Sequence, residues 1–93
     1  MNPTELIREH MPELRNTYKV SRIGVFGSFA RDEATESSDV DILVEFSQNV
    51  GLFHFIDLQT RLAQILDRKI DLTTPGALHP VIKEQILREV LYI

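Results

Sequence analysis

Apolar residues gather in three short segments that we expect to form strands, at residues 19–26, Val40–Phe46 and residues 69–73. Valine, isoleucine, leucine and phenylalanine supply most of the apolar positions, and the branched and aromatic residues among them fit a pleated, half-buried surface. The second segment has the clearest alternation of apolar and other residues. Its apolar side chains are those of Val40, Ile42, Val44 and Phe46.

Elsewhere the apolar residues recur every three or four positions, as they do on one face of a helix. The clearest stripe predicts a helix over residues 51–67, with apolar positions Leu52, Phe55, Leu58, Leu62, Ile65 and Leu66. A last helix is expected from Pro80 to about Leu91, with an apolar side made of Ile82, Ile86, Leu87, Val90 and Leu91. A first helix begins after the N-cap residue Asn2, and Pro12 predicts a kink or a restart near Met11 because proline cannot donate a backbone hydrogen bond.

This order of elements predicts a single α/β domain over residues 1–93, with a small mixed sheet of about three strands covered by about four helices. A strand followed by a helix and a further strand is typical of such a sheet. Phe53 and Phe55 are expected in its core rather than as a platform for nucleic-acid bases. The three histidines lie in different elements without ligand spacing, so we interpret them as structural or surface residues.

Composition excludes several classes of protein. A hydrophobic content of 43% with 26% charged residues is ordinary for a globular domain, and no apolar run approaches the roughly 20 residues that span a bilayer. The N-terminus lacks a basic-then-apolar signal pattern, which predicts a cytoplasmic protein without a membrane partner. The absence of cysteine excludes disulfides. The net charge of −4, with no basic stripe, argues against direct nucleic-acid binding.

Two acids stand at alternating positions where the second predicted strand opens, Asp39 directly before Val40 and Asp41 directly after it. Alternate side chains of a strand point to the same face, so the two carboxylates lie side by side while Val40 and Ile42 point to the core. Like charges on one strand face repel, and a divalent cation removes that cost. Because Mg²⁺ binds one or two carboxylates together with substrate phosphates, the pair predicts a magnesium site.

A tight turn, Gly27-Ser28, ends the first predicted strand and supplies a candidate phosphate site. Glycine allows close approach of the backbone, and Ser28 offers a hydroxyl and an amide at the start of one helical turn expected over residues 29–31. Residues 32–38 are then a polar loop. Asp71 stands between two aliphatic residues in the third predicted strand, so it joins Asp39 and Asp41 if that strand lies beside the second. Carboxylates that face a phosphate site predict metal-assisted phosphoryl or nucleotidyl transfer.

The stretch GVFGSFARDEATESSDVDILVEF, with Gly-Ser, ten intervening residues and Asp-x-Asp, resembles the nucleotidyltransferase superfamily that includes DNA polymerase beta. More narrowly, it resembles the minimal nucleotidyltransferases (MNT), small prokaryotic proteins that are paired with a HEPN-domain partner. The resemblance covers nearly the whole chain. It implies the nucleotidyltransferase fold and an antitoxin that transfers AMP from ATP to a hydroxyl, a tyrosine above all, of a HEPN toxin.

The same resemblance implies roles for six residues. Asp39 and Asp41 would hold two Mg²⁺ ions, and Asp71 would bind the catalytic one and help to deprotonate the acceptor hydroxyl. Gly27 and Ser28 would hold the β- and γ-phosphates of the nucleoside triphosphate, and Arg31 could reach a phosphate. The sheet, the phosphate turn and the helices use all 93 residues, so the acceptor is expected on another molecule.

Plainer interpretations stay open beside these roles. Asp39 and Asp41 could be solvated acids at a strand entry, and Asp71 could be a surface residue. Ser28 could be an ordinary turn serine and Arg31 a solvated arginine.

One departure from the family pattern is visible at Asp32, where many MNT sequences have glycine; its charge could weaken triphosphate binding or simply face solvent. Two other functions also remain. One is an antitoxin that neutralises its toxin by binding alone, and the other is nucleotidyl transfer to a small molecule.

Overall fold

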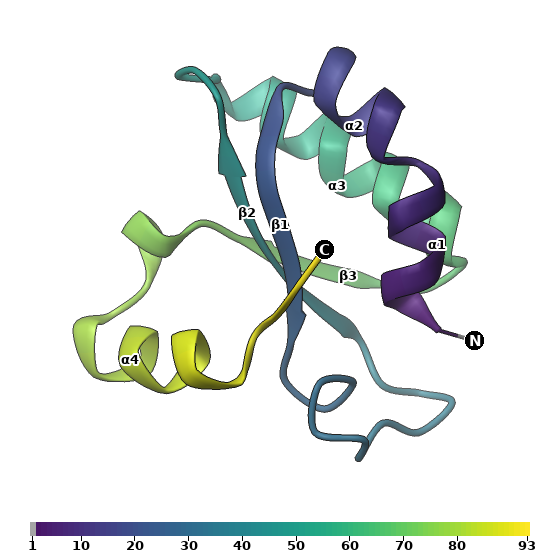
Figure 1. Ribbon diagram of the computed structural model, residues 1–93, viewed down its shortest axis with the longest axis vertical. Coiled ribbons are helices and arrows are strands. Elements are labelled where there is room, and N and C mark those ends of the chain that lie inside the picture. Colours follow the sequence, from purple (N-terminus) through teal and green to yellow (C-terminus); the bar gives the residue numbers. More distant parts are fainter. Residues whose placement is uncertain (1) are drawn as a thin grey trace.

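A four-stranded mixed sheet in the order β3-β2-β1-β4 forms the centre of the computed structural model, which describes residues 2–93 (Figure 1). Its strands are β1 (Val20–Phe26), β2 (Val40–Phe46), β3 (Ile70–Thr73) and β4 (Leu91–Tyr92). The helices are α1 (Pro3–Glu9), α2 (Met11–Asn16), α3 (Leu52–Leu66), the 3₁₀ turn η1 (Pro75–Ala77) and α4 (Pro80–Glu89). The α/β class predicted from the sequence is confirmed.

The pairing of the strands follows from their connections. A loop joins β1 to β2, which pair antiparallel, whereas α3 carries the chain back so that β3 runs parallel to β2. A parallel neighbour needs such a crossover of a dozen or more residues, and α3 supplies it. The register between β2 and β3 places Val40 beside Ile70, Asp41 beside Asp71 and Ile42 beside Leu72.

One face of the sheet is apolar and packs against α1, α2 and α3. The residues of this core are Ile7, Met11, Leu14, Val20, Ile23, Val25, Val40, Ile42, Val44, Leu58, Leu62, Leu66, Ile70 and Leu72. Because strand residues alternate, the residues between them in β2 and β3 project from the opposite face, where Asp41 and Asp71 stand. The apolar core thus fixes which face carries the acids.

The predicted break in the N-terminal helix is confirmed. The side chain of Asn2 accepts a hydrogen bond from the Thr4 backbone N–H at 3.1 Å and caps α1. The helix stops at His10, and Pro12 stands in the first turn of α2, where its missing N–H costs nothing. Within residues 2–93 no helix is long and apolar enough to cross a membrane.

The C-terminal segment differs from the prediction of a helix running to about Leu91. Helix α4 ends at Glu89, and Leu91 and Tyr92 form a short fourth strand on β1, so the sheet has four strands rather than about three. Gly24 explains how the segment comes so close. A β-carbon on Gly24 would lie 2.7 Å from Val90 Cγ2 and 2.9 Å from the Leu91 carbonyl oxygen.

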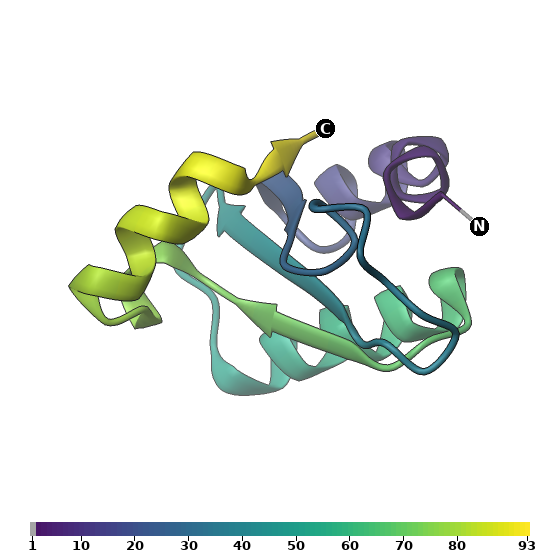
Figure 2. The same ribbon diagram turned by 90° about the horizontal axis from the view of Figure 1, so that it is seen from below.

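Two apolar stripes are also less buried than predicted. On α4 only Ile86 is buried, whereas Val81, Ile82 and Leu87 are exposed, and α4 lies apart from α1, α2 and α3 (Figures 1 and 2). At the start of α3, Leu52 is exposed and the prediction that Phe53 belongs to the core is wrong, because 82% of its surface is accessible. Phe55, its neighbour two positions on, packs against the core as expected.

We predict that Gly24→Ala lowers the free energy of unfolding by about 2 kcal/mol, because the added methyl group would collide with the backbone of β4. Urea denaturation measures the loss. Gly76→Ala is the matched control, since a β-carbon on Gly76 meets nothing within 4 Å and should leave stability unchanged. Equal effects of the two substitutions would contradict the close packing of the C-terminal segment against Gly24 of β1.

Candidate active site

Two carboxylates, Asp41 and Asp71, are held side by side on neighbouring parallel strands. They are partners in the β2–β3 register, and strands in such a ladder lie about 4.8 Å apart. Asp41 is half-buried and Asp71 is exposed. The expectation that the third strand lies next to the second and carries Asp71 to the acid face is therefore met by the geometry.

The surroundings of Asp41 make its ionised form costly. Burial is the main cause that raises the pKa of Asp41 to about 6, and the negative charges of Asp71 and Asp39 act in the same direction. The positive charge of Arg31 opposes this rise, so Arg31 lies within electrostatic reach of the acids. A carboxylate cluster of this kind stores electrostatic repulsion that a bound cation would relieve.

Gly27 brings the backbone turn into contact with Asp41. Its φ of +71° is left-handed, a conformation that glycine adopts without a steric penalty. A β-carbon at this position would lie 2.1 Å from Asp41 Oδ2, so no side chain fits between the turn and the acid. Glycine is therefore required for two reasons: it permits the left-handed turn, and it lets the backbone lie directly against the Asp41 carboxylate.

The predicted helical turn follows Gly27. The Arg31 backbone N–H donates to the Gly27 carbonyl at 3.1 Å, and the Glu33 N–H donates to the Ser28 carbonyl at 2.8 Å. These bonds close the turn around Ser28, which is half-buried and follows the glycine that lies against Asp41. The turn and Asp41 therefore lie next to each other, and their assignment to one site remains a prediction.

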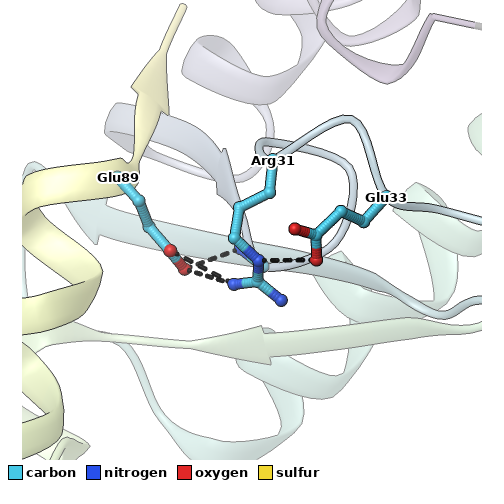
Figure 3. A network of polar contacts seen from close by, with 4 residues as sticks. Arg31, Glu33 and Glu89 are labelled. Carbon is cyan, nitrogen blue, oxygen red and sulfur yellow. Dashed lines mark hydrogen bonds and ion pairs between the residues drawn. The ribbon is translucent and has the colours of Figure 1, made fainter.

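Arg31 points back to this turn, but its charge already has partners (Figure 3). Arg31 Nε donates to Glu33 at 3.2 Å, and Nη1 donates to both oxygens of Glu89 at 3.2 and 3.1 Å. These two carboxylates raise the pKa of Arg31 above its usual value, and the hydrogen bond to Glu33 is the largest single cause. Glu89 also accepts a hydrogen bond from the Gly27 backbone N–H at 3.1 Å.

The acid face fits a magnesium ion without forming a closed cage. Asp39 is exposed and precedes β2, and within residues 2–93 no three His, Cys, Asp or Glu side chains stand close enough to enclose a metal. Mg²⁺ keeps several waters and takes one or two carboxylates plus phosphate oxygens, so an open pair beside a backbone turn suits it. Asp41 and Asp71 are the pair, with Asp39 at the rim.

Asp32 occupies the position where the family pattern has glycine. Its backbone conformation explains why glycine is common there and why aspartate can replace it. Its φ is +58°, in the left-handed region that glycine favours and that aspartate tolerates better than most residues. The side chain is exposed. Of the two expectations for Asp32, the geometry agrees with the one in which it faces solvent.

Sequence reasoning missed Glu89, whose carboxylate reaches the site from the end of α4. No pattern identifies it, because its partners lie about sixty residues away in the chain and α4 was expected to continue past it.

The three histidines have the structural roles expected of them. His10 and His54 bond to the backbone carbonyls of Leu6 and Tyr18, and His79 caps α4.

Comparison with known proteins decides the family. The sequence profile of the nucleotidyltransferase domain matches residues 7–93, which include every candidate residue of the site. The chain belongs to the nucleotidyltransferase domain family. This confirms the resemblance drawn from the Gly-Ser and Asp-x-Asp motif.

Individual members of the family agree with this assignment. The protein adenylyltransferase MntA of Thermococcus cleftensis is 43% identical over 88 residues, which cover 95% of this chain and 89% of that protein. A solved structure named "putative minimal nucleotidyltransferase" has a TM-score of 0.81 and 35% identity, and the match covers 98% of this chain and 95% of that one. A crystal structure of a variant of the toxin–antitoxin MntA-HpeT has a TM-score of 0.72 and 25% identity, over 100% of this chain and 72% of that one. The nucleotidyltransferase fold is therefore shown.

The raised pKa of Asp41 predicts a pH-dependent stability of the metal-free nucleotidyltransferase domain. The folded protein holds the Asp41 proton more tightly than the unfolded chain, so stability falls as the pH rises from about 3.8 to about 6. Asp41→Asn should raise the free energy of unfolding by about 1 kcal/mol at pH 7, a value reduced for solvent screening, and should have no such effect below pH 4. Urea denaturation in EDTA measures both; a gain that persists at low pH would contradict this origin.

Gly27→Ala tests the contact between the turn and the acids. The new methyl group must displace Asp41 and strain the left-handed backbone, so we expect kcat/KM for nucleotidyl transfer to fall about 100-fold. Steady-state kinetics measures the loss, with Gly51→Ala as control because a β-carbon there meets nothing within 4 Å. Activity close to that of the wild type in Gly27→Ala would mean that the turn does not shape the site.

Proposed function

We propose that this nucleotidyltransferase is the antitoxin of a HEPN/MNT pair and transfers AMP from ATP to a tyrosine hydroxyl of its HEPN toxin. One observation supports the proposal above all: the β2–β3 register sets Asp41 beside Asp71, and the Gly27 turn lies against the Asp41 carboxylate. This arrangement offers negative charge for a cation and backbone donors for a phosphate within one small site.

In the proposed reaction the chain's residues hold the triphosphate and receive a proton. Gly27 and Ser28 bind the β- and γ-phosphates through the backbone and the serine hydroxyl, and Arg31 offers a positive charge beside them. The acceptor hydroxyl attacks the α-phosphorus, the bond to the β-phosphate breaks and pyrophosphate leaves. Asp71, the more exposed carboxylate of the pair, takes up the hydroxyl proton.

Asp41 and Asp71 would be the main carboxylates that hold two Mg²⁺ ions, and Asp39 would join them from the rim of the site. The ions would supply Lewis-acid stabilisation of the attacking and leaving oxygens. The raised pKa of Asp41 fits this role, because a group that is strained when ionised alone gains most from a cation. The strands fix Asp41 and Asp71 through the apolar residues on their other face, so the ligands are placed before the ions arrive.

The comparisons support the same proposal. The Thermococcus cleftensis relative is named a protein adenylyltransferase, and the MntA-HpeT structure is that of a toxin–antitoxin. Both matches cover nearly all of this chain, including the turn and the acids. A cytoplasmic location suits an antitoxin and remains a prediction.

The proposal predicts that the wild-type protein, incubated with its HEPN partner, ATP and Mg²⁺, adds AMP to that partner. Intact mass spectrometry should show a gain of one or more AMP units, and peptide mapping should place them on tyrosine. The double substitution Asp39→Ala with Asp41→Ala should abolish the gain because it removes two of the three carboxylates. No gain with the wild type, under conditions in which the two proteins form a complex, would overturn the proposal.

A second function, neutralisation by binding alone, is favoured by the exposed apolar side chains. Leu52 and Phe53 on α3 and Val81 on α4 are each at least two-thirds accessible, and such residues are enriched where proteins meet. The same double substitution separates the two functions. If the variant still protects cells from the toxin, neutralisation is by binding alone. If the variant still forms the complex but no longer protects cells, neutralisation needs catalysis.

A further inference from the structure

The carboxylate of Glu89 accepts hydrogen bonds from two groups, the Gly27 backbone and Arg31, that the proposed function assigns to the phosphates. One of its oxygens accepts from the Gly27 backbone N–H at 3.1 Å and from Arg31 Nη1 at 3.2 Å, and the other accepts from Arg31 at 3.1 Å. Figure 3 shows Glu89 reaching across from the end of α4 to the guanidinium. A backbone donor combined with an arginine is a typical set of ligands for a phosphate oxygen.

The position of Glu89 is unfavourable for its own helix. It is the last residue of α4, where the carbonyl groups of the helix terminus make the potential negative. A carboxylate there needs compensation from elsewhere, and Gly27 and Arg31 provide it. The Glu89 side chain is accordingly only 19% exposed, against 68% for Glu84 on the same helix.

A triphosphate cannot share these donors with Glu89. The Gly27 N–H carries a single hydrogen, which already points to Glu89 Oε1. Arg31 is also held by Glu33 on its Nε side, so its two carboxylates already exceed its single positive charge. A further anion at this place would meet a negative rather than a positive surface unless Glu89 moved away.

Glu89 can leave without opening the core. Helix α4 buries only Ile86, and neither Ile86 nor Glu89 belongs to the core cluster between the sheet and α1–α3. A change of side-chain rotamer is enough to free both donors. On the basis of the proposed function, we infer that Glu89 competes with the nucleoside triphosphate for Gly27 and Arg31. Glu89 thereby lowers the affinity of the protein for the triphosphate, and its carboxylate must leave both groups before the phosphates bind there.

The test compares the affinity of the full chain and its variants for ATP with Mg²⁺, for inorganic tripolyphosphate and for adenosine, by titration calorimetry. Glu89→Gln keeps the size of the side chain and removes its charge. We expect the Kd for ATP and for tripolyphosphate to fall about tenfold, because a larger fraction of the protein is competent to bind. Adenosine lacks phosphates, so the substitution should leave its binding unchanged.

Glu84→Gln is the matched control, because Glu84 lies on the same helix and is paired with Arg88 on the surface. It removes the same charge from the protein and should change the Kd by less than about twofold. An unchanged or increased Kd in Glu89→Gln would overturn the inference and make Glu89 a positioning residue for Arg31. If the wild type binds neither ATP nor tripolyphosphate, the proposed function fails with it.

A measurement on the wild type avoids any effect of the substitution on folding. The side-chain carboxyl carbon of Glu89, observed by NMR, should move toward the shift of a free glutamate when tripolyphosphate is added. The amide signal of Gly27 should move in the same titration, since it exchanges one anion for another. A Glu89 signal that stays in place while tripolyphosphate binds would contradict the competition.

Discussion

The parallel pairing of β2 with β3 is the constraint on which the site depends. It sets Asp41 beside Asp71, an arrangement that at roughly 5 Å and an effective dielectric of about 20 costs roughly 3 kcal/mol when both are ionised. The apolar residues on the reverse of the same strands hold the register against this repulsion. A slip of β3 by one residue would carry Ile70 and Leu72 out of the core, so the acids cannot move apart along the strands.

The parts of this arrangement that rest on short-range patterns could be predicted from the sequence. Alternation in β2 identifies its buried face, and the same rule applied to Ile70 and Leu72 places Asp71 on the other face. The break before α2 follows from Pro12, and the turn follows from Gly27. Each of these features is decided by residues within a few positions of one another, where propensity and stereochemistry act directly.

The remaining features depend on contacts between distant segments. Val90 and Leu91 continue the helical spacing of α4, yet they leave the helix because Gly24 gives them a place beside β1. Phe53 fits the apolar content of its segment, but its helix turns it toward solvent. Glu89 looks like any surface acid until the fold brings Arg31 to it. Spacing along a helix cannot reveal such contacts, since they are set by the tertiary structure.

The acids and the Gly27 turn therefore differ in whether their charges and hydrogen bonds are satisfied. The acids repel one another and gain from a cation, whereas the donors of the Gly27 turn are already satisfied by Glu89. On the proposed function, a free triphosphate would have to displace a carboxylate while facing three others. A triphosphate that carries Mg²⁺ brings the acids their missing charge, and this gain can offset the loss of the Glu89 contacts. If both proposals hold, metal binding and phosphate binding are coupled through residues of β2, β3 and the end of α4.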